Sequence, residues 1–104
     1  MREGLEKLLA KGQDSAVLRF GLGQACLKEE DYAAAALHLA QAVAQNPQYS
    51  AAWKLLGKAQ LALGDTVAAR QAWESGLACA QGKGDAQVVK ELGVFLKRLD
   101  KNAS

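Results

Sequence analysis

A repeat with a period of 34 residues constrains the fold of this chain more than any other feature of its sequence. When residue 16 is aligned with residue 50, Leu22-Gly23 falls on Leu56-Gly57. The same shift aligns Ala25 with Ala59, Leu27 with Leu61, Asp31 with Asp65, Ala34-Ala35 with Ala68-Ala69, and Leu39 with Trp73. A period of this length is typical of one helix–turn–helix unit, and such units stack side by side. The sequence therefore predicts stacked helical hairpins.

Half units flank the two repeats. Running the shift backwards aligns Leu5 with Leu39, so we interpret the opening helix as the second half of an earlier unit. A shift of 36 places Leu92-Gly93 on Leu56-Gly57, which predicts another first helix near the end. We expect one domain over 1–104, made of a half-repeat helix in 1–14, repeats at 16–49 and 50–83, and a capping helix at 85–100.

Helical periodicity runs through most of the chain, and turn residues interrupt it at five points. Aspartates at the turns are expected to cap the helices that follow, and glycines are expected to close the helices that precede them. The capping aspartates are Asp14, Asp31, Asp65 and Asp85, and the closing glycines are Gly64, Gly82 and Gly84. Six helices are predicted, at about 2–11, 15–28, 32–45, 49–62, 66–81 and 85–99, followed by a frayed tail at 101–104.

The Leu-Gly pairs lie in the middle of their helices, where glycine costs about 1 kcal/mol of helix propensity relative to alanine. Close approach of a neighbouring helix offsets this cost, because no side chain then separates the two backbones. Ala35 and Ala69 play the matching part on the second helices. Four large residues are expected to fill the space between hairpins: Phe20, Leu39, Trp53 and Trp73.

These residues resemble the tetratricopeptide repeat family, whose small bacterial-type members the chain is similar to. The second unit carries the family pattern as Trp53-x2-Leu56-Gly57, Ala69 and Trp73. The first unit carries it as Leu22-Gly23, Ala35, Leu39, Ala42 and Pro47. The resemblance implies an all-α fold, a right-handed superhelical stack of antiparallel helix hairpins with about six helices. Arg19, Gln60 and Gln81 depart from the pattern, because the family has apolar residues or proline there.

Composition excludes several other classes. The 104 residues carry a net charge of +2 and no run of five like charges, which argues against a nucleic-acid-binding protein. The chain shows no signal peptide and no apolar stretch long enough for a membrane span, so we expect the cytoplasm. Cys26 and Cys79 are expected to be buried reduced thiols, with a disulfide or redox pair as the alternative.

No arrangement of residues indicates catalysis. His38 is the only histidine, and its sequence neighbourhood favours a surface or structural role. Zinc-ligand spacing and a phosphate-binding loop are absent from the sequence, so we expect no metal, no cofactor and no enzymatic activity. Gly82-Lys83-Gly84-Asp85 is expected to be a plain turn, with anion binding at the following helix as the alternative.

The family resemblance implies that the first helices of the units line a concave groove that receives a segment of a partner protein. The family's groove positions correspond here to Phe20, Gln24, Leu27, Lys28, Lys54, Leu55, Lys58, Leu61, Lys90, Val94 and Lys97. Lysines outnumber acidic residues on this set, so an acidic, partly apolar segment would be complementary. The alternative is that these lysines only form a solvated face.

Two further hypotheses concern partners. In some family members a clamp of Lys, Asn and Arg binds a C-terminal carboxylate, but the matching positions here do not fit that clamp. They are Phe20, Gln24, Leu55, Gln87 and Glu91. The alternative to an adaptor is a self-associating module, so the chain is expected to be a monomer or a weak homodimer. The apolar end residues proposed for that contact are Leu5, Leu9, Val88, Phe95 and Leu99.

Overall fold

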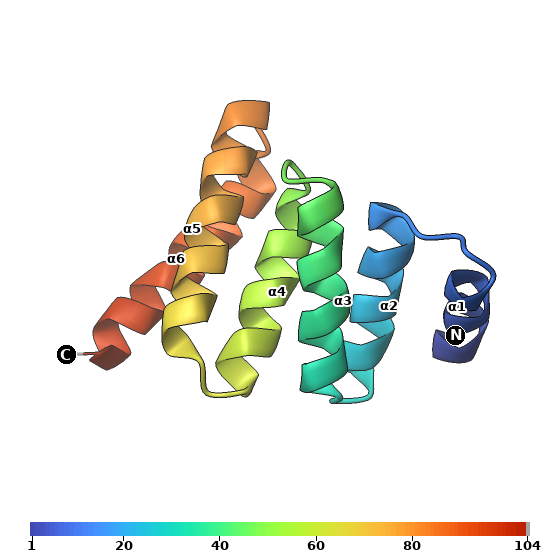
Figure 1. Ribbon diagram of the computed structural model, residues 1–104. Helices are drawn as coiled ribbons and strands as arrows, with labels where there is room; N and C mark the ends of the chain where they lie inside the picture. The colour runs from blue at the N-terminus through green and yellow to red at the C-terminus, as the bar shows by residue number, and fades with distance from the viewer. Residues whose placement is uncertain (104) are drawn as a thin grey trace.

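The computed structural model describes residues 1–103, and every regular element within them is an α-helix. Figure 1 shows the six helices following one another in a row, with the two termini at opposite ends. Their bounds are α1 Arg2–Ala10, α2 Ala16–Lys28, α3 Tyr32–Gln45, α4 Ser50–Ala62, α5 Thr66–Lys83 and α6 Ala86–Ala103. The predicted all-α stack of six helices is therefore confirmed.

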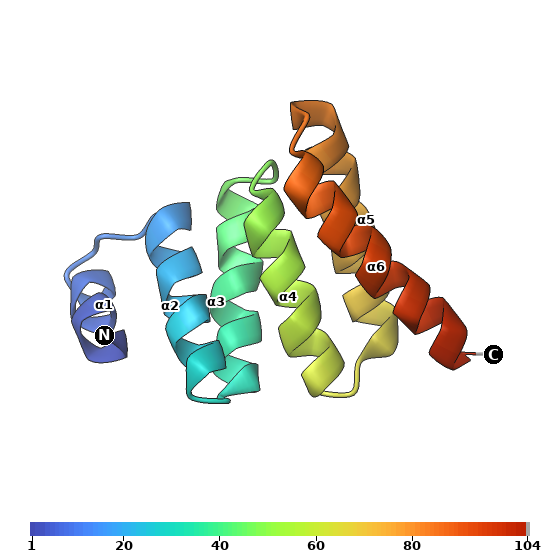
Figure 2. The same cartoon turned by 180° about the vertical axis from the view of Figure 1, so that it is seen from behind.

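The helices form two layers. α2 pairs with α3 and α4 pairs with α5 in the two most extensive helix–helix contacts of the chain. Seen from behind, α2, α4 and α6 lie in front of α3 and α5 (Figure 2). Contacts of α4 with both α2 and α6 join this front layer into one surface. We call it the groove face. The molecule is elongated, with extents of 45 × 29 × 18 Å.

Helix ends agree with the predicted turns except at three places. Ser15, rather than Asp14, caps α2: its hydroxyl oxygen accepts a hydrogen bond from the Leu18 N–H at 3.1 Å. Gly82 lies inside α5, and Gly84 closes that helix in the left-handed conformation. The tail expected at 101–104 is instead the last turn of α6 as far as Ala103, while Ser104 lies outside the described residues.

The mid-helix glycines do what their position predicts in both hairpins. A Cβ on Gly23 would clash with the Leu39 side chain, and a Cβ on Gly57 would clash with the indole of Trp73. The Trp73 ring is further fixed by its N–H, which donates to the Lys54 carbonyl at 2.9 Å. Each glycine thus provides space for a large residue of the second helix, which offsets its poor helix propensity.

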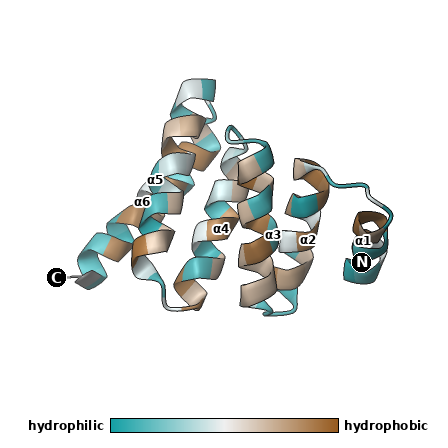
Figure 3. Cartoon of the chain, in the orientation of Figure 1, coloured by the Kyte–Doolittle hydropathy of each residue, from teal (hydrophilic) through white to brown (hydrophobic). Residues whose placement is uncertain are grey.

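Apolar burial follows the stack. Figure 3 shows hydrophobic and hydrophilic residues interleaved along α6, as expected of a helix with one buried face. One cluster centres on Cys26, Leu39 and Leu56, and a second one includes Trp73 and Leu92. Of the four large residues expected between hairpins, Leu39 and Trp73 are buried, whereas Phe20 and Trp53 are only partly buried. Phe20 stacks on Tyr49 with ring centroids 4.8 Å apart.

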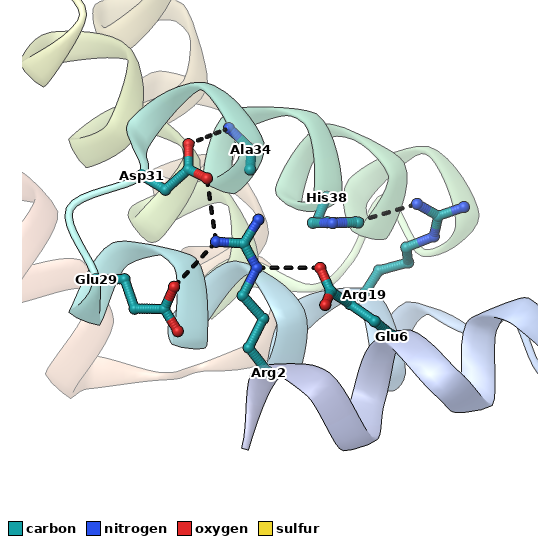
Figure 4. Close-up of polar contacts among 7 residues, drawn as sticks. All are labelled: Arg2, Glu6, Arg19, Glu29, Asp31, Ala34 and His38. Atoms are coloured by element: carbon teal, nitrogen blue, oxygen red, sulfur yellow. Dashed lines mark hydrogen bonds and ion pairs between the residues drawn. The ribbon is translucent and has the colours of Figure 1, made fainter.

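The helix α1 is attached differently, because none of its residues is buried. Leu5 reaches α2 beside Gly21, and the other anchor is ionic. The Arg2 guanidinium lies 3.0 Å from the Asp31 carboxylate and 3.1 Å from those of Glu29 and Glu6 (Figure 4). These ion pairs tie the start of α1 to the turn between α2 and α3.

Candidate functional site

The eleven predicted groove residues all belong to α2, α4 or α6, so they lie on the layer that forms the groove face. Their side chains fall into two groups by solvent exposure. The exposed ones are Gln24, Lys28, Lys58, Leu61, Lys90, Val94 and Lys97, and the partly buried ones are Phe20, Leu27, Lys54 and Leu55. Phe20, Leu27 and Leu55 pack against the core, so they support the surface more than they offer contacts.

Lys54 is held within the chain. Its ammonium group lies 3.2 Å from the Glu91 carboxylate, with the two side chains 20% and 33% exposed. This ion pair joins α4 to α6, and the Lys54 carbonyl meanwhile accepts the Trp73 indole N–H. Lys54 therefore has a structural role here, and the Glu91 carboxylate is already neutralised by a cation.

An open pocket of about 270 Å³ lies between α4 and α6 on this face. Its apolar part consists of Leu61, Trp73, Phe95 and Leu99, with the Trp73 and Phe95 ring centroids 5.1 Å apart. Its polar lining residues are Lys58, Arg98 and Asn102. We call it the α4–α6 pocket.

Lys58 has an unusual environment for a surface lysine. Its ammonium nitrogen lies 5.3 Å from the centre of the Phe95 ring, within the range of a cation–π contact. Within residues 1–103, no carboxylate lies in ion-pair range of Lys58 or of Arg98. The pocket thus combines an aromatic surface with two cations that form no internal ion pair.

The predicted groove set included Lys58 and Leu61 but missed the aromatic part of the pocket. Trp73 was assigned only to packing between hairpins, and Phe95 to an apolar end face. Asn102 was assigned to a frayed tail. Phe95 lies one residue beyond Val94 on α6, so a wider view of that helix face would have included it. Nothing in the spacing alone shows that Trp73 reaches the pocket from the other layer.

A second hollow, of about 660 Å³, lies between α1 and α2. Phe20 and Gln24 of the predicted groove lie on its lining, together with Leu5 and Leu8 of α1. Four of the eleven predicted groove residues therefore line these two hollows, two in each. A third one, beside α5, contains Gln60, whose buried Oε1 has no hydrogen-bond partner among the described residues.

Arg19 and His38 form a polar network at the junction of α1, α2 and α3. The Arg19 guanidinium binds both oxygens of Asp14, at 2.8 and 2.9 Å, and donates to Nδ1 of His38 at 3.1 Å. Because arginine can only donate, that nitrogen must be the acceptor of a neutral imidazole. Burial and the Arg19 charge lower the pKa of His38, which keeps it neutral.

This network explains how arginine is accommodated at a position where the family has a large apolar residue. Hydrogen bonds from Arg19 and then from Gln45 lower the pKa of Asp14 to about 2, so the carboxylate is charged at neutral pH. All the groups in the network bind one another, and no reactive pair of nucleophile and base results. The structural role predicted for His38 agrees with this geometry.

The described residues offer little support for metal binding, a membrane-spanning helix or a disulfide. No group of three His, Cys, Asp or Glu among residues 1–103 could hold a metal ion. No described helix is both long and apolar enough to cross a membrane. Cys26 is buried as expected, whereas Cys79 is only partly buried and donates to the Pro47 carbonyl at 3.1 Å; both are free thiols.

Comparisons with known proteins agree with this architecture. Two family profiles described as "Tetratricopeptide repeat" match residues 27–90 and 2–49. The chain is 59% identical over 101 residues to the "TPR repeat-containing protein PA0015" of Pseudomonas aeruginosa, covering 97% of this chain and 96% of that one. It is 53% identical to protein BPP2914 of Bordetella parapertussis, whose solution structure superposes with a TM-score of 0.84. That alignment covers 98% of this chain and 89% of the other.

Proposed function

Because the chain belongs to the tetratricopeptide repeat family, we propose that it is an adaptor that binds a segment of a partner protein on its groove face. Members of this family generally mediate protein–protein interactions. The α4–α6 pocket is the observation that supports this surface most directly. It offers an open apolar hollow beside Lys58 and Arg98, for which residues 1–103 provide no ion-pair partner.

The pocket favours one kind of contact. An apolar side chain of the partner would lie against Phe95 and Leu61, because Trp73, at 3% exposure, forms the buried base of the pocket. Burial of about 25 cal/mol per Å² of apolar surface supplies the affinity. Leu61, which lines the pocket, is 40% exposed, and Val94 of α6, at 41%, adds exposed apolar surface outside it. A short peptide or helix with one large apolar anchor fits this geometry.

The charges favour an acidic partner. Lys58 and Arg98 line the pocket, and Lys90 and Lys97 are further exposed cations of α6. A carboxylate next to the apolar anchor would pair with Lys58 or Arg98 in a partly desolvated place, which increases both specificity and the rate of association. We therefore propose an acidic, partly apolar segment as the partner.

The proposed mode differs from the clamp that binds a C-terminal carboxylate. At the clamp positions Phe20 stacks on Tyr49 and Glu91 pairs with Lys54, so neither offers a cation to a chain terminus. We propose binding without catalysis, in the reducing cytoplasm, a compartment that fits two free thiols.

The test compares three baits in affinity capture from the native lysate, read by mass spectrometry. They are the wild type, Lys58→Glu with Arg98→Glu, and the control Lys7→Glu with Lys11→Glu. Both double variants change the net charge equally and at exposed positions. We expect one partner to be retained by the wild type and the control but lost from the pocket variant.

The partner's affinity is then measured by the change in the chain's tryptophan fluorescence, to which Trp53 and Trp73 both contribute and of which Trp73 lines the pocket. We expect the pocket variant to bind at least about tenfold more weakly, which corresponds to 1.4 kcal/mol. Thermal unfolding serves as the folding control, with a change below about 1 kcal/mol expected from loss of the cation–π contact. Equal capture by the wild type and a folded pocket variant would exclude this pocket as the binding site.

A further inference from the structure

Helix α6 presents a vacant position that is filled in both preceding hairpins. Gly23 of α2 receives Leu39, and Gly57 of α4 receives Trp73. The repeat alignment places Gly93 of α6 at the same position, yet a Cβ built there meets no atom within 4 Å. Within the described residues no atom fills the space at Gly93, and the neighbouring Val89 and Leu96 pack only partly against the core cluster of α5 and α6. We call this side of α6 the Gly93 face, formed by Val89, Gly93 and Leu96.

Helix α1 also lacks a partner helix on one side. The repeat alignment pairs it with α3 and α5, the helices that fill the glycine positions, and places Leu5 on Leu39. In the first hairpin, α2 covers one side of α3. No described helix occupies the corresponding position beside α1. A Cβ on Gly4 meets nothing within 4 Å, and Leu8 remains 36% exposed. We call this side of α1 the Leu5 face, formed by Gly4, Leu5 and Leu8; Leu5 also touches α2 beside Gly21, and both leucines line the hollow between α1 and α2.

We propose that two copies of this chain associate head to tail, with the Leu5 face of one copy packed on the Gly93 face of the next. Leu5 would then fill the space at Gly93 as Leu39 fills the space at Gly23. The contact continues the α2–α3 and α4–α5 pairing, which is the most extensive helix contact within the chain. It would extend the stack without a change of geometry.

The position of the two helices fixes the symmetry. α1 and α6 lie at opposite ends of the molecule (Figures 1 and 2), so one copy cannot satisfy both faces by itself. A contact between two different surfaces is heterologous and leaves one face open at each end of the assembly. Because hairpin helices run antiparallel, Asp100 of α6, whose carboxylate pairs with Arg70 at 2.6 Å, would lie near the N-terminal end of α1, whose N–H groups favour a negative charge.

This contact differs from the end-face pairing expected from sequence. Val88 is buried inside the chain, and Phe95 and Leu99 line the α4–α6 pocket on the groove face, so those three residues do not belong to the Gly93 face. Val89 and Leu96 of the Gly93 face are half-buried and add little apolar area. We therefore expect weak association, with a Kd on the order of 10⁻⁴ M, which leaves the groove face free.

Sedimentation velocity at protein concentrations from about 10 μM to 1 mM tests the proposal. With a Kd on the order of 10⁻⁴ M, the fraction of associated chains should rise across this range. Three matched variants are compared with the wild type: Gly93→Gln, Gly4→Gln and the control Gly82→Gln. All three glycines lie in helices with open space around the added Cβ, so each variant should fold. We expect the sedimentation coefficient to rise with concentration for the wild type and the control. It should stay constant for the other two variants.

Mixing the two blocked variants distinguishes a head-to-tail contact from a symmetric one. Gly93→Gln retains an intact Leu5 face and Gly4→Gln retains an intact Gly93 face, so an equimolar mixture should form dimers and nothing longer. A mixture that stays monomeric would overturn the head-to-tail arrangement. Wild-type protein that remains monomeric at 1 mM, or a Gly93→Gln variant that associates like the wild type, would overturn the proposal altogether.

Discussion

Glycines at equivalent repeat positions have different surroundings, so the same substitution is expected to have opposite effects. Gly57→Ala forces a Cβ against the Trp73 indole and should lower the unfolding free energy by about 1–3 kcal/mol. Gly93→Ala meets nothing and should raise it by about 1 kcal/mol through helix propensity. Thermal unfolding measures both, with shifts of about 4–8 °C per kcal/mol for a domain of this size. Destabilisation by Gly93→Ala would show that α6 is already covered in solution.

Glu30 carries backbone strain that its repeat equivalent avoids. Its φ is +61°, whereas Gly64 has +85° at the corresponding position before Asp65. A residue with a Cβ pays about 1 kcal/mol or more in this region. Glu30→Gly should therefore raise the melting temperature, with Glu30→Ala as a control that removes the same carboxylate but keeps a Cβ and therefore the strain. Equal effects of the two changes in a melting experiment would contradict this explanation.

The way α1 is attached gives a prediction about local opening. Arg2 binds three carboxylates, while no residue of α1 is buried, so ion pairs hold a large share of this contact. Arg2→Met should speed amide hydrogen exchange in α1 and leave α4 unchanged, and added salt should act in the same direction. Lys7→Met removes the same charge from an exposed position of the same helix and serves as the control.

The junction of α1, α2 and α3 should make stability depend on pH. Burial first, then Arg19 and Arg2, lower the pKa of His38, while Glu6 and Asp14 oppose them. The unfolded chain then binds a proton more readily than the folded one, so stability is complete above about pH 6.5 and falls as the pH decreases. Below about pH 4, Asp14 adds a second loss in the same direction, because its folded pKa is about 2. Melting temperatures of wild type and His38→Gln between pH 8 and 5 test the first step, which the variant should lack.

At the scale of helices the sequence was informative because its signal is periodic. The 34-residue shift predicted the hairpins, and Asp31 and Asp65 cap α3 and α5 as expected. Contacts between distant side chains could not be read in this way. The Lys54–Glu91 ion pair joins residues 37 positions apart, and Trp73 reaches the α4–α6 pocket from the other layer. The repeat pattern marks where such residues lie, but their final orientation depends on three-dimensional packing.

The whole molecule is a row in which each helix contacts only near neighbours, so stability should vary along it. α3 and α4 have packed neighbours on both sides, whereas α1 contacts α2 alone among the described helices. In such a one-dimensional stack local opening is easiest at the ends. Native-state hydrogen exchange should therefore give the greatest protection in α3 and α4 and the least in α1.

The proposed association should make this variation of stability along the chain depend on protein concentration. A second copy bound to α1 or α6 would give that terminal helix another packed neighbour. Binding to the folded state stabilises the segment that takes part in the contact. Protection of α1 should then increase between about 10 μM and 1 mM in wild type and Gly82→Gln but not in Gly93→Gln. An unchanged gradient in the wild type would mean that the ends open independently of other copies, whatever the groove face binds.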